Sequence, residues 1–166
     1  MLLLISSLLL MSCGADKYMK KGEKFLALGE YYDAAYQFKQ AYKRTPVKER
    51  DTRGKRALKM AQCYQRINAT PKAIAAYRNA IRYNQASKED QLAYARQLLK
   101  NGDYRQAEKV FLMLKDSMPG NQLIANGLKS AQMAPEWKKQ GSRYIVKRMD
   151  VFNSRRHDYS PVLFGD

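Results

Sequence analysis

The sequence contains few of the residues from which catalytic and metal sites are built. Its 166 residues include a single histidine, His157, and two cysteines, Cys13 and Cys63. These three residues do not have the spacing of a zinc site, and the chain lacks a glycine-rich phosphate loop and a nucleophile elbow. Its 15 acidic residues are scattered, with no pair that indicates acid–base catalysis. We therefore predict no enzymatic activity, no metal site and no cofactor.

Acidic residues are also scarce relative to basic ones. The chain has 15 Asp and Glu against 31 Lys and Arg, which gives a net charge of +16. A dense basic block consists of Lys39, Lys43, Arg44, Lys48, Arg50, Arg53, Lys55, Arg56 and Lys59. Such a block attracts acidic protein surfaces, anionic lipids or phosphate-rich lipopolysaccharide, or it is a solvated surface that keeps the protein soluble.

One residue pattern occurs three times along the chain. Each copy has a small residue, then an alanine, and four residues after it an aromatic residue. The three copies are Gly22, Ala34 and Phe38; Ala61, Ala73 and Tyr77; and Ala95, Ala107 and Phe111. The alanines of the three copies lie 39 and then 34 residues apart, at positions 34, 73 and 107.

The repeated residue types predict pairs of closely packed helices. Two helices approach closely where a small side chain faces a large one, so Gly22, Ala61 and Ala95 provide the space. Residues four apart share a helical face, which places each aromatic next to its alanine in the gap between helices. The alternative is an ordinary helical bundle whose aromatic residues line the core.

The pattern resembles the tetratricopeptide repeat, in which two helices form a hairpin and hairpins stack in series. The resemblance implies an all-α superhelix of about three hairpins plus a capping helix. We place the domain at residues 17–134, with repeats at about 15–48, 54–87 and 88–121 and the capping helix at 122–133. Residues 47–53 lengthen either the first inter-repeat loop or the helix after it.

Turn residues fall where the repeat requires them. Gly29 and Glu30 are predicted to end the first helix, and Thr70 followed by Pro71 is typical of an N-cap with proline at the first helical position. Asp103 with Gln106 matches a capping box.

The N-terminal segment is apolar. Residues 1–12 carry no charge, and an apolar stretch this short cannot cross a bilayer, which requires about 20 residues. A short apolar segment closing on small residues is typical of a secretory signal. The alternative is a buried helix with a chance cysteine.

The residues up to Cys13 indicate how such a signal would be processed. The run from Leu10 to Cys13 resembles the lipobox of bacterial lipoproteins. The resemblance implies that residues 1–12 are cleaved and that Cys13 is acylated, with chains such as palmitate. Residues 13–16 would then form the lipid-anchored N-terminus. Gly14 at the next position favours the outer membrane by the same analogy, facing the periplasm. Export would leave no role for nucleic acid.

The pattern changes after Pro135, and we predict an extended segment over residues 135–166. Residues 144–152 alternate in polarity and predict a strand. The run from Asp158 to Asp166 resembles the opening of a blade in the WD40-like propellers of TolB-type periplasmic proteins. This resemblance implies that the chain is an N-terminal fragment of a longer protein.

The order of parts resembles Bacteroidetes envelope lipoproteins that continue into a β-propeller and an OmpA-like domain, some of which serve type IX secretion. It implies a lipid-anchored, non-enzymatic scaffold for envelope proteins, joined to peptidoglycan only through a domain beyond Asp166. Two alternatives stay open: a lipoprotein that assembles outer-membrane β-barrels, and the targeting part of an envelope hydrolase whose catalytic domain lies outside the sequence.

Binding in such arrays uses the concave groove lined by the first helix of each pair. Residues off the packing face of those helices are the candidates, and they are Lys20, Lys24, Lys59, Gln62, Arg66, Arg96 and Gln97. Their chemistry favours an acidic or carboxylate-bearing peptide. The alternative is that they are ordinary exposed polar residues.

Overall fold

The computed structural model describes residues 2–141 and residue 145, with side chains described from Gly14 onward. Seven helices and no strands make up this part of the chain. They are α1 (Leu2–Ala27), α2 (Tyr31–Arg44), α3 (Arg50–Arg66), α4 (Thr70–Arg82), α5 (Lys88–Asn101), α6 (Tyr104–Ser117) and α7 (Gln122–Gln140). The predicted all-α class is confirmed.

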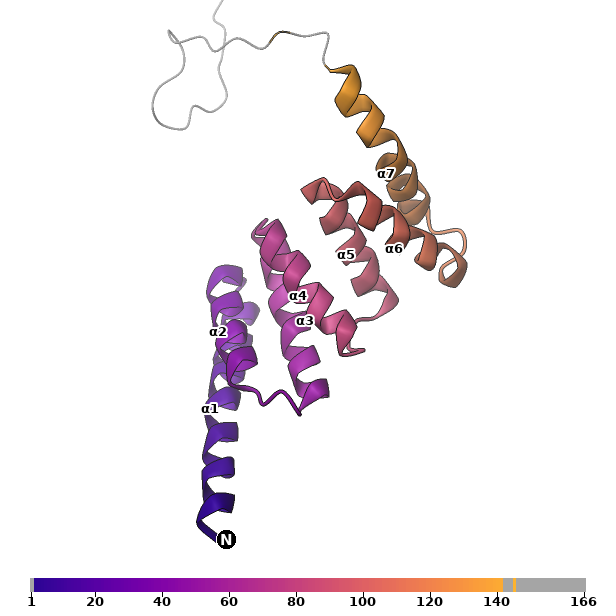
Figure 1. Cartoon of the computed structure of the whole chain (residues 1–166). Helices are drawn as coiled ribbons and strands as arrows, with labels where there is room; N and C mark the ends of the chain where they lie inside the picture. Colours follow the sequence, from indigo (N-terminus) through magenta and orange to yellow (C-terminus); the bar gives the residue numbers. More distant parts are fainter. Residues whose placement is uncertain (1, 142–144, 146–166) are drawn as a thin grey trace, which may run out of the picture.

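The helices form three hairpins in series, closed by α7 (Figure 1). Helix α1 pairs with α2, α3 with α4 and α5 with α6, and the hairpins join through contacts of α2 with α3 and of α4 with α5. Helix α7 packs on α6 and also touches α5. Because each hairpin contacts mainly its neighbours, the hydrophobic core runs along the stack.

The three hairpins share one turn geometry. Gly29, Asn68 and Gly102 have φ values of 76°, 56° and 84°, in the left-handed region that ends helices. The amide of the next residue donates a hydrogen bond of 2.9 Å to the carbonyl five residues back in all three turns. These turn residues lie 39 and 34 residues apart, the spacing found for the repeated alanines, so the turns belong to the repeat.

The repeated aromatic residues lie in the core. The exposed fractions of Phe38, Tyr77 and Phe111 are 0%, 1% and 0%, and the alanine four residues before each is fully buried. Gly22 leaves room for Phe38, because a Cβ atom at Gly22 would lie 2.6 Å from Phe38 Cε1. The aromatic side chain of one helix therefore occupies space that a small residue leaves on its partner.

Helix starts differ from the sequence prediction inside the hairpins. Thr70 is the first residue of α4 and not its N-cap, and the cap residue Ala69 has no side-chain hydrogen bond. Asp103 precedes α6 without a side-chain cap bond, so the predicted capping box is wrong. A capping box occurs instead at Ser87 and Asp90, at the start of α5.

Two element boundaries also differ. Helix α3 begins at Arg50, so part of the extra segment between the first two repeats lengthens that helix. Helix α7 extends to Gln140 and contains Pro135, so residues 135–140 are helical and the predicted end at residue 133 is too early. The predicted strand and propeller-like run lie outside the described residues, as does His157; Ile145 alone is described, and it is exposed.

The predicted leader and the first repeat helix form one continuous helix, because α1 begins at Leu2 and contains Cys13. Over the described residues, no helix combines the length and the apolar character needed to cross a membrane.

Two arginines of the basic block point into the protein. Arg56 is 7% exposed. Its guanidinium pairs with Asp16 of α1 at 2.5 Å and also donates to the hydroxyl of Thr45. Arg53 donates to the backbone carbonyl of Thr45 at 2.5 Å and lies 4.3 Å from the ring centre of Tyr42. Both side chains therefore fasten the α2–α3 connection and are not part of a free basic surface.

We expect Arg56→Ala to lower the free energy of unfolding by about 1.5 to 3 kcal/mol, because it removes charge-assisted hydrogen bonds between α1, α3 and the α2–α3 connection. Asp16 is more than half exposed, so water can solvate its carboxylate afterwards, which limits the loss. Urea unfolding measures the difference. Arg78→Ala on α4, where the side chain is exposed, is the control and should change stability by less than about 0.5 kcal/mol. Equal stabilities of the two variants would contradict the assignment.

Candidate functional site

Two adjoining hollows lie along the first helices of the second and third hairpins. The hollow toward the α3–α4 turn has a volume of about 540 Å³ and is lined by Gln65, Arg66, Asn68, Ala93, Arg96, Gln97, Leu99 and Lys100. The other has a volume of about 400 Å³ and is lined by Leu26, Tyr31, Gln62, Gln65, Arg66, Tyr77, Glu89, Asp90 and Ala93. They share Gln65, Arg66 and Ala93 and so form one groove across α3 and α5, which we call the α3–α5 groove.

The first hollow has cationic and amide side chains. Arg66, Arg96 and Lys100 contribute three positive charges, and none of the described residues that line this hollow is a carboxylate. Lys100 Nζ donates a hydrogen bond of 2.7 Å to Asn68 Oδ1. The Arg66 guanidinium lies 5.7 Å from the ring centre of Tyr31. Guanidinium groups bind carboxylates through paired hydrogen bonds, so this hollow has the chemistry of an anion site.

Gln97 supplies the amide at the base of this hollow. Its side chain is 8% exposed, and Oε1 has no hydrogen-bond partner among the described atoms. An amide oxygen accepts hydrogen bonds, so its missing partner is an N–H or O–H donor. A buried amide with an unmet hydrogen bond costs about 1 to 3 kcal/mol, a cost that a bound polar group would remove.

The second hollow carries both signs of charge. Gln62 Nε2 donates to Asp90 Oδ1 at 3.2 Å, and Tyr77 donates its hydroxyl proton to Gln65 Oε1 at 2.6 Å. Burial, followed by the nearby charge of Asp90, raises the pKa of Tyr77 to about 12, so it stays a donor at neutral pH. Hydrogen bonds from its own backbone and from Ser87 lower the pKa of Glu89 and favour its ionised form. The α3–α5 groove is thus cationic at one end and mixed at the other.

Of the residues predicted to bind a partner, Gln62, Arg66, Arg96 and Gln97 line the α3–α5 groove. Gln97, predicted to lie off the packing face of its helix, is buried. The remaining three, Lys20, Lys24 and Lys59, do not line either hollow; Lys59 is half-buried and the other two are exposed.

The structure adds groove residues that the sequence prediction missed. Lys100 lies four residues after Arg96, and Gln65 lies three after Gln62, so helical spacing alone could have identified both. Tyr31 comes from α2, the second helix of its hairpin, and its position depends on how the first two hairpins stack. No sequence signal indicates it.

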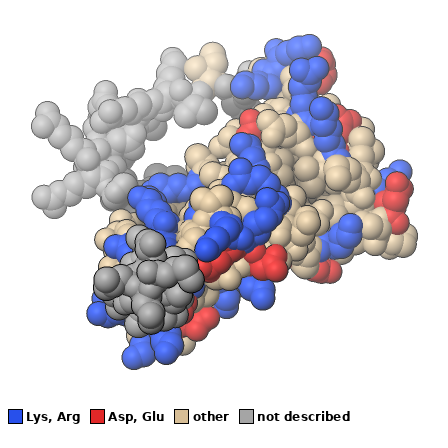
Figure 2. Space-filling view, turned by 60° about the horizontal axis from the view of Figure 1, so that its bottom comes forward, with Lys and Arg blue, Asp and Glu red and all other residues tan. Residues whose placement is uncertain are grey.

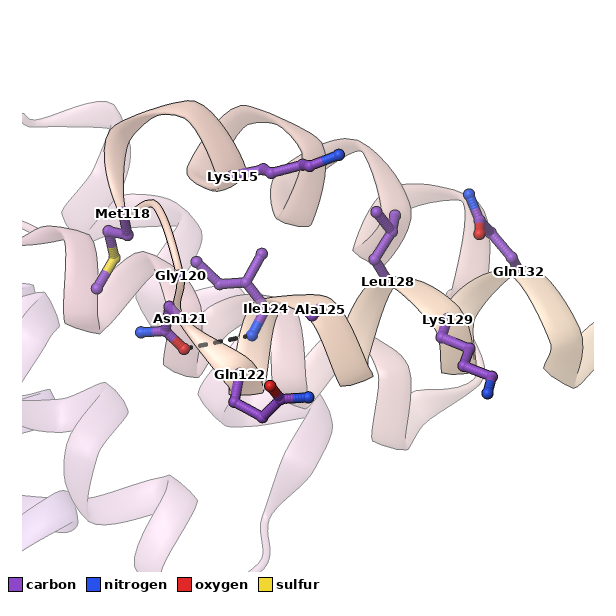
Figure 3. A pocket seen from close by; sticks show the side chains of 10 residues that line it. All are labelled: Lys115, Met118, Gly120, Asn121, Gln122, Ile124, Ala125, Leu128, Lys129 and Gln132. Atoms are coloured by element: carbon purple, nitrogen blue, oxygen red, sulfur yellow. Dashed lines mark hydrogen bonds between the residues drawn. The ribbon is translucent and has the colours of Figure 1, made fainter.

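A third hollow lies at the far end of the stack (Figure 3). It has a volume of about 360 Å³, is formed by the end of α6 and by α7, and contains Met118, Ile124 and Leu128 beside Lys115 and Lys129. The Asn121 side chain caps α7 at its rim by accepting a hydrogen bond from the Ile124 amide at 3.4 Å. None of the predicted binding residues lies here.

Cys63 is buried, and burial raises the pKa of its thiol to about 11. The thiol is therefore protonated at neutral pH and is a poor nucleophile. Within the described part of the chain, no cluster of three or more His, Cys, Asp or Glu residues could hold a metal ion.

No protein family model matches the chain, and no curated protein sequence matches it. Similar structures are known. The first TPR domain of Spaghetti bound to the HSP90 peptide SRMEEVD is 17% identical with a TM-score of 0.59, covering 76% of this chain and 96% of that one.

Two further structures give the same result. A C-terminal TPR-containing domain of a Plasmodium falciparum putative FK506-binding protein is 15% identical with a TM-score of 0.62, covering 79% of this chain and 94% of that one. The TPR2B domain of yeast Sti1 in complex with pHsp70 is 15% identical with a TM-score of 0.56, covering 74% and 98%. The chain therefore has the fold of a tetratricopeptide-repeat superhelix.

Proposed function

We propose that this chain is a non-enzymatic protein-interaction module, in which the α3–α5 groove binds an acidic peptide segment of a partner protein. The observation that carries the proposal is the cationic hollow of that groove. Three positive charges and a buried amide with an unmet hydrogen bond converge there without a carboxylate among the described lining residues. An acidic side chain or a C-terminal carboxylate would neutralise the charges, and a backbone amide of the same peptide would donate to Gln97 Oε1.

The similar structures support a peptide as the ligand class, because one of the three described above holds the acidic HSP90 peptide SRMEEVD and another is a complex with pHsp70. The mixed second hollow fits the rest of such a peptide. Glu89 and Asp90 would accept hydrogen bonds from its backbone amides or contact a basic side chain, and Tyr31 and Leu26 offer apolar contact.

We further propose where this module acts. The apolar leader and the lipobox-like residues before Cys13 support export and a lipid anchor on that cysteine, in the outer membrane and facing the periplasm. The scaffold would then gather envelope proteins, in the manner of type IX secretion components, and would reach peptidoglycan through a domain beyond Asp166.

A panel of immobilised heptapeptides with free carboxyl ends, differing in the number of acidic residues, tests the groove. We expect peptides with two or more acidic residues near the end to bind, and the double variant Arg66→Glu, Arg96→Glu to weaken binding by at least about tenfold, because two charge-assisted contacts become repulsive. Higher salt should weaken binding of the unmodified chain.

The matched control reverses two exposed charges outside the groove, Arg78→Glu on α4 and Lys109→Glu on α6. It changes the net charge equally, so a general loss of electrostatic attraction would affect both double variants alike. The proposal would be contradicted if both double variants lost affinity equally. It would also be contradicted if no peptide of the panel bound the unmodified chain more tightly than the Arg66→Glu, Arg96→Glu variant.

A further inference from the structure

The folded domain begins immediately after Cys13, without a linker. Gly14 is half-buried, and Ala15 is 2% exposed. Asp16 is fixed to the buried Arg56 by an ion pair of 2.5 Å. Helix α1 passes through Cys13 without a break and extends beyond the α2–α3 connection (Figure 1). A lipid attached at Cys13 would therefore hold the domain against the bilayer surface.

The part of the domain beside Gly14 is basic. A hollow of about 660 Å³ is lined there by Gly14, Lys43, Arg44, Thr45, Pro46, Val47 and Arg53. Lys43, Arg44 and the adjacent Lys48 are exposed. Figure 2 shows the end from which α1 emerges, and Lys and Arg side chains cover much of it, with Asp and Glu in smaller groups.

The connection that carries these residues is held in place. Arg53 donates to the Thr45 carbonyl, and the Thr45 hydroxyl donates to the Ala41 carbonyl at 2.8 Å and accepts from Arg56. Val47 lies in this connection, and its side chain is 72% exposed. An apolar side chain between exposed cations, on an ordered loop, suits the boundary between lipid headgroups and acyl chains.

We propose that the surface formed by Lys43, Arg44, Val47 and Lys48, which we call the α2–α3 face, lies directly on an anionic phospholipid surface. Lys43, Arg44 and Lys48 contact the headgroup phosphates, and Val47 enters the boundary with the acyl chains. Each cation near such a surface strengthens binding about fivefold. Asp51 and Glu49 on the neighbouring residues oppose this attraction, but the exposed Arg50 between them adds a fourth cation, so positive charge stays in excess.

This inference rests on the proposed lipid anchor, and it fixes the orientation of the scaffold. With the α2–α3 face on the membrane, the first hairpin lies at the bilayer and α7 is at the opposite end of the stack (Figure 1). The α3–α5 groove then lies on the side of the stack, open to a soluble or membrane-bound partner.

The test places a fluorescent label, sensitive to polarity, at Val47→Cys in the full acylated chain reconstituted into vesicles. Cys63 is buried, so the label reacts at the new cysteine. We expect a blue shift of the label in vesicles that contain phosphatidylglycerol at low salt, and none in phosphatidylcholine vesicles or at high salt. A label at Met113→Cys, on α6 and 70% exposed, should not shift.

The variant Lys43→Glu, Arg44→Glu, Lys48→Glu should abolish the shift at position 47. The matched control Lys109→Glu, Lys115→Glu, Lys129→Glu, on exposed positions of α6 and α7, should keep it. An acylated chain whose label at position 47 behaves alike on both lipids, or keeps its shift in the first variant, would overturn the inference.

The intact mass of the same sample reports acylation, which separates this test from that of the anchor. If the mass shows no lipid, the anchor proposal fails, and the unacylated chain is then sedimented with vesicles of either composition. Binding that requires phosphatidylglycerol, and that is about a hundredfold weaker in the Lys43→Glu, Arg44→Glu, Lys48→Glu variant but not in the matched control, would still support the membrane contact of the α2–α3 face. Binding that ignores lipid composition, or survives in that variant, would overturn it.

Discussion

Phe111→Ala is expected to lower the free energy of unfolding by about 3 to 5 kcal/mol, with a similar loss for Phe38→Ala. Phe111 is fully buried, and a Cβ atom added at Gly127 of α7 would overlap its ring. The ring thus fills the space between α6 and the closing helix. Truncation leaves a cavity in rigidly packed surroundings, which adds to the lost burial of the side chain.

Denaturant unfolding followed by far-ultraviolet circular dichroism measures this loss. Met113→Ala on the same helix is the control, because Met113 is 70% exposed and should change stability by less than about 0.5 kcal/mol. The double variant Phe111→Leu, Gly127→Ala restores part of the volume on the opposite helix and should be more stable than Phe111→Ala. A Phe111→Ala chain that unfolds like the control would exclude the interlocked packing.

The stack is predictable from the sequence because its determinants are local and repeated. Small residues, alanines and aromatic residues recur at helical spacing, and each copy alone indicates the same pair of helices. The predicted end of helix α7 is too early because Pro135 resembles a helix terminator. The proline is exposed and lies in a helix whose preceding turns already pack on α6 and α5, so the helix continues through it although the hydrogen bond to the Ala131 carbonyl is missing.

The capping errors have a common cause. Inside each hairpin the left-handed turn residue fixes the cap residue after it, and Glu30, Ala69 and Asp103 have ψ values of 68°, 61° and 56° with no side-chain cap bond. The connections before α5 and α7 leave Ser87 and Asn121 extended, with ψ values of 177° and 109°, and both side chains cap their helix. Asp103 is of a residue type that commonly caps helices, so at this position the backbone of the tight turn prevents the cap bond.

The candidate site was predictable only in part. Helical spacing identifies residues on the inner face of α3 and α5, such as Arg66 and Arg96. It does not reveal that Arg56 pairs with Asp16, 40 residues away, because that contact depends on how α1 meets α3. Exposure of a charged residue likewise depends on tertiary contacts, so the basic block divides into arginines that fasten the fold and cations that face solvent.

Cys13→Ser is expected to abolish membrane retention of the chain. If Cys13 carries two or more acyl chains, each buried methylene contributes about 0.8 kcal/mol, which makes release from the bilayer negligible. The variant lacks the sulfur that bears the lipid and is prepared without the apolar residues 1–12, whose cleavage depends on the lipobox. Its remaining attraction to the membrane is then the electrostatic contact of the α2–α3 face, which salt screens. The expected result is therefore a protein that a high-salt wash removes from membranes, while the unmodified chain stays.

Cys63→Ser is the matched control for this experiment. It removes the other cysteine, but that thiol is buried with a pKa of about 11, so it should not accept a lipid, and retention should stay unchanged. Intact mass supplies an independent reading, since only chains that keep Cys13 should carry the added mass of the lipid. If the unmodified chain lacks that mass, Cys13 is not the anchor. The same holds if salt releases the Cys13→Ser and Cys63→Ser variants equally, because only the loss of the acylated residue should release the chain.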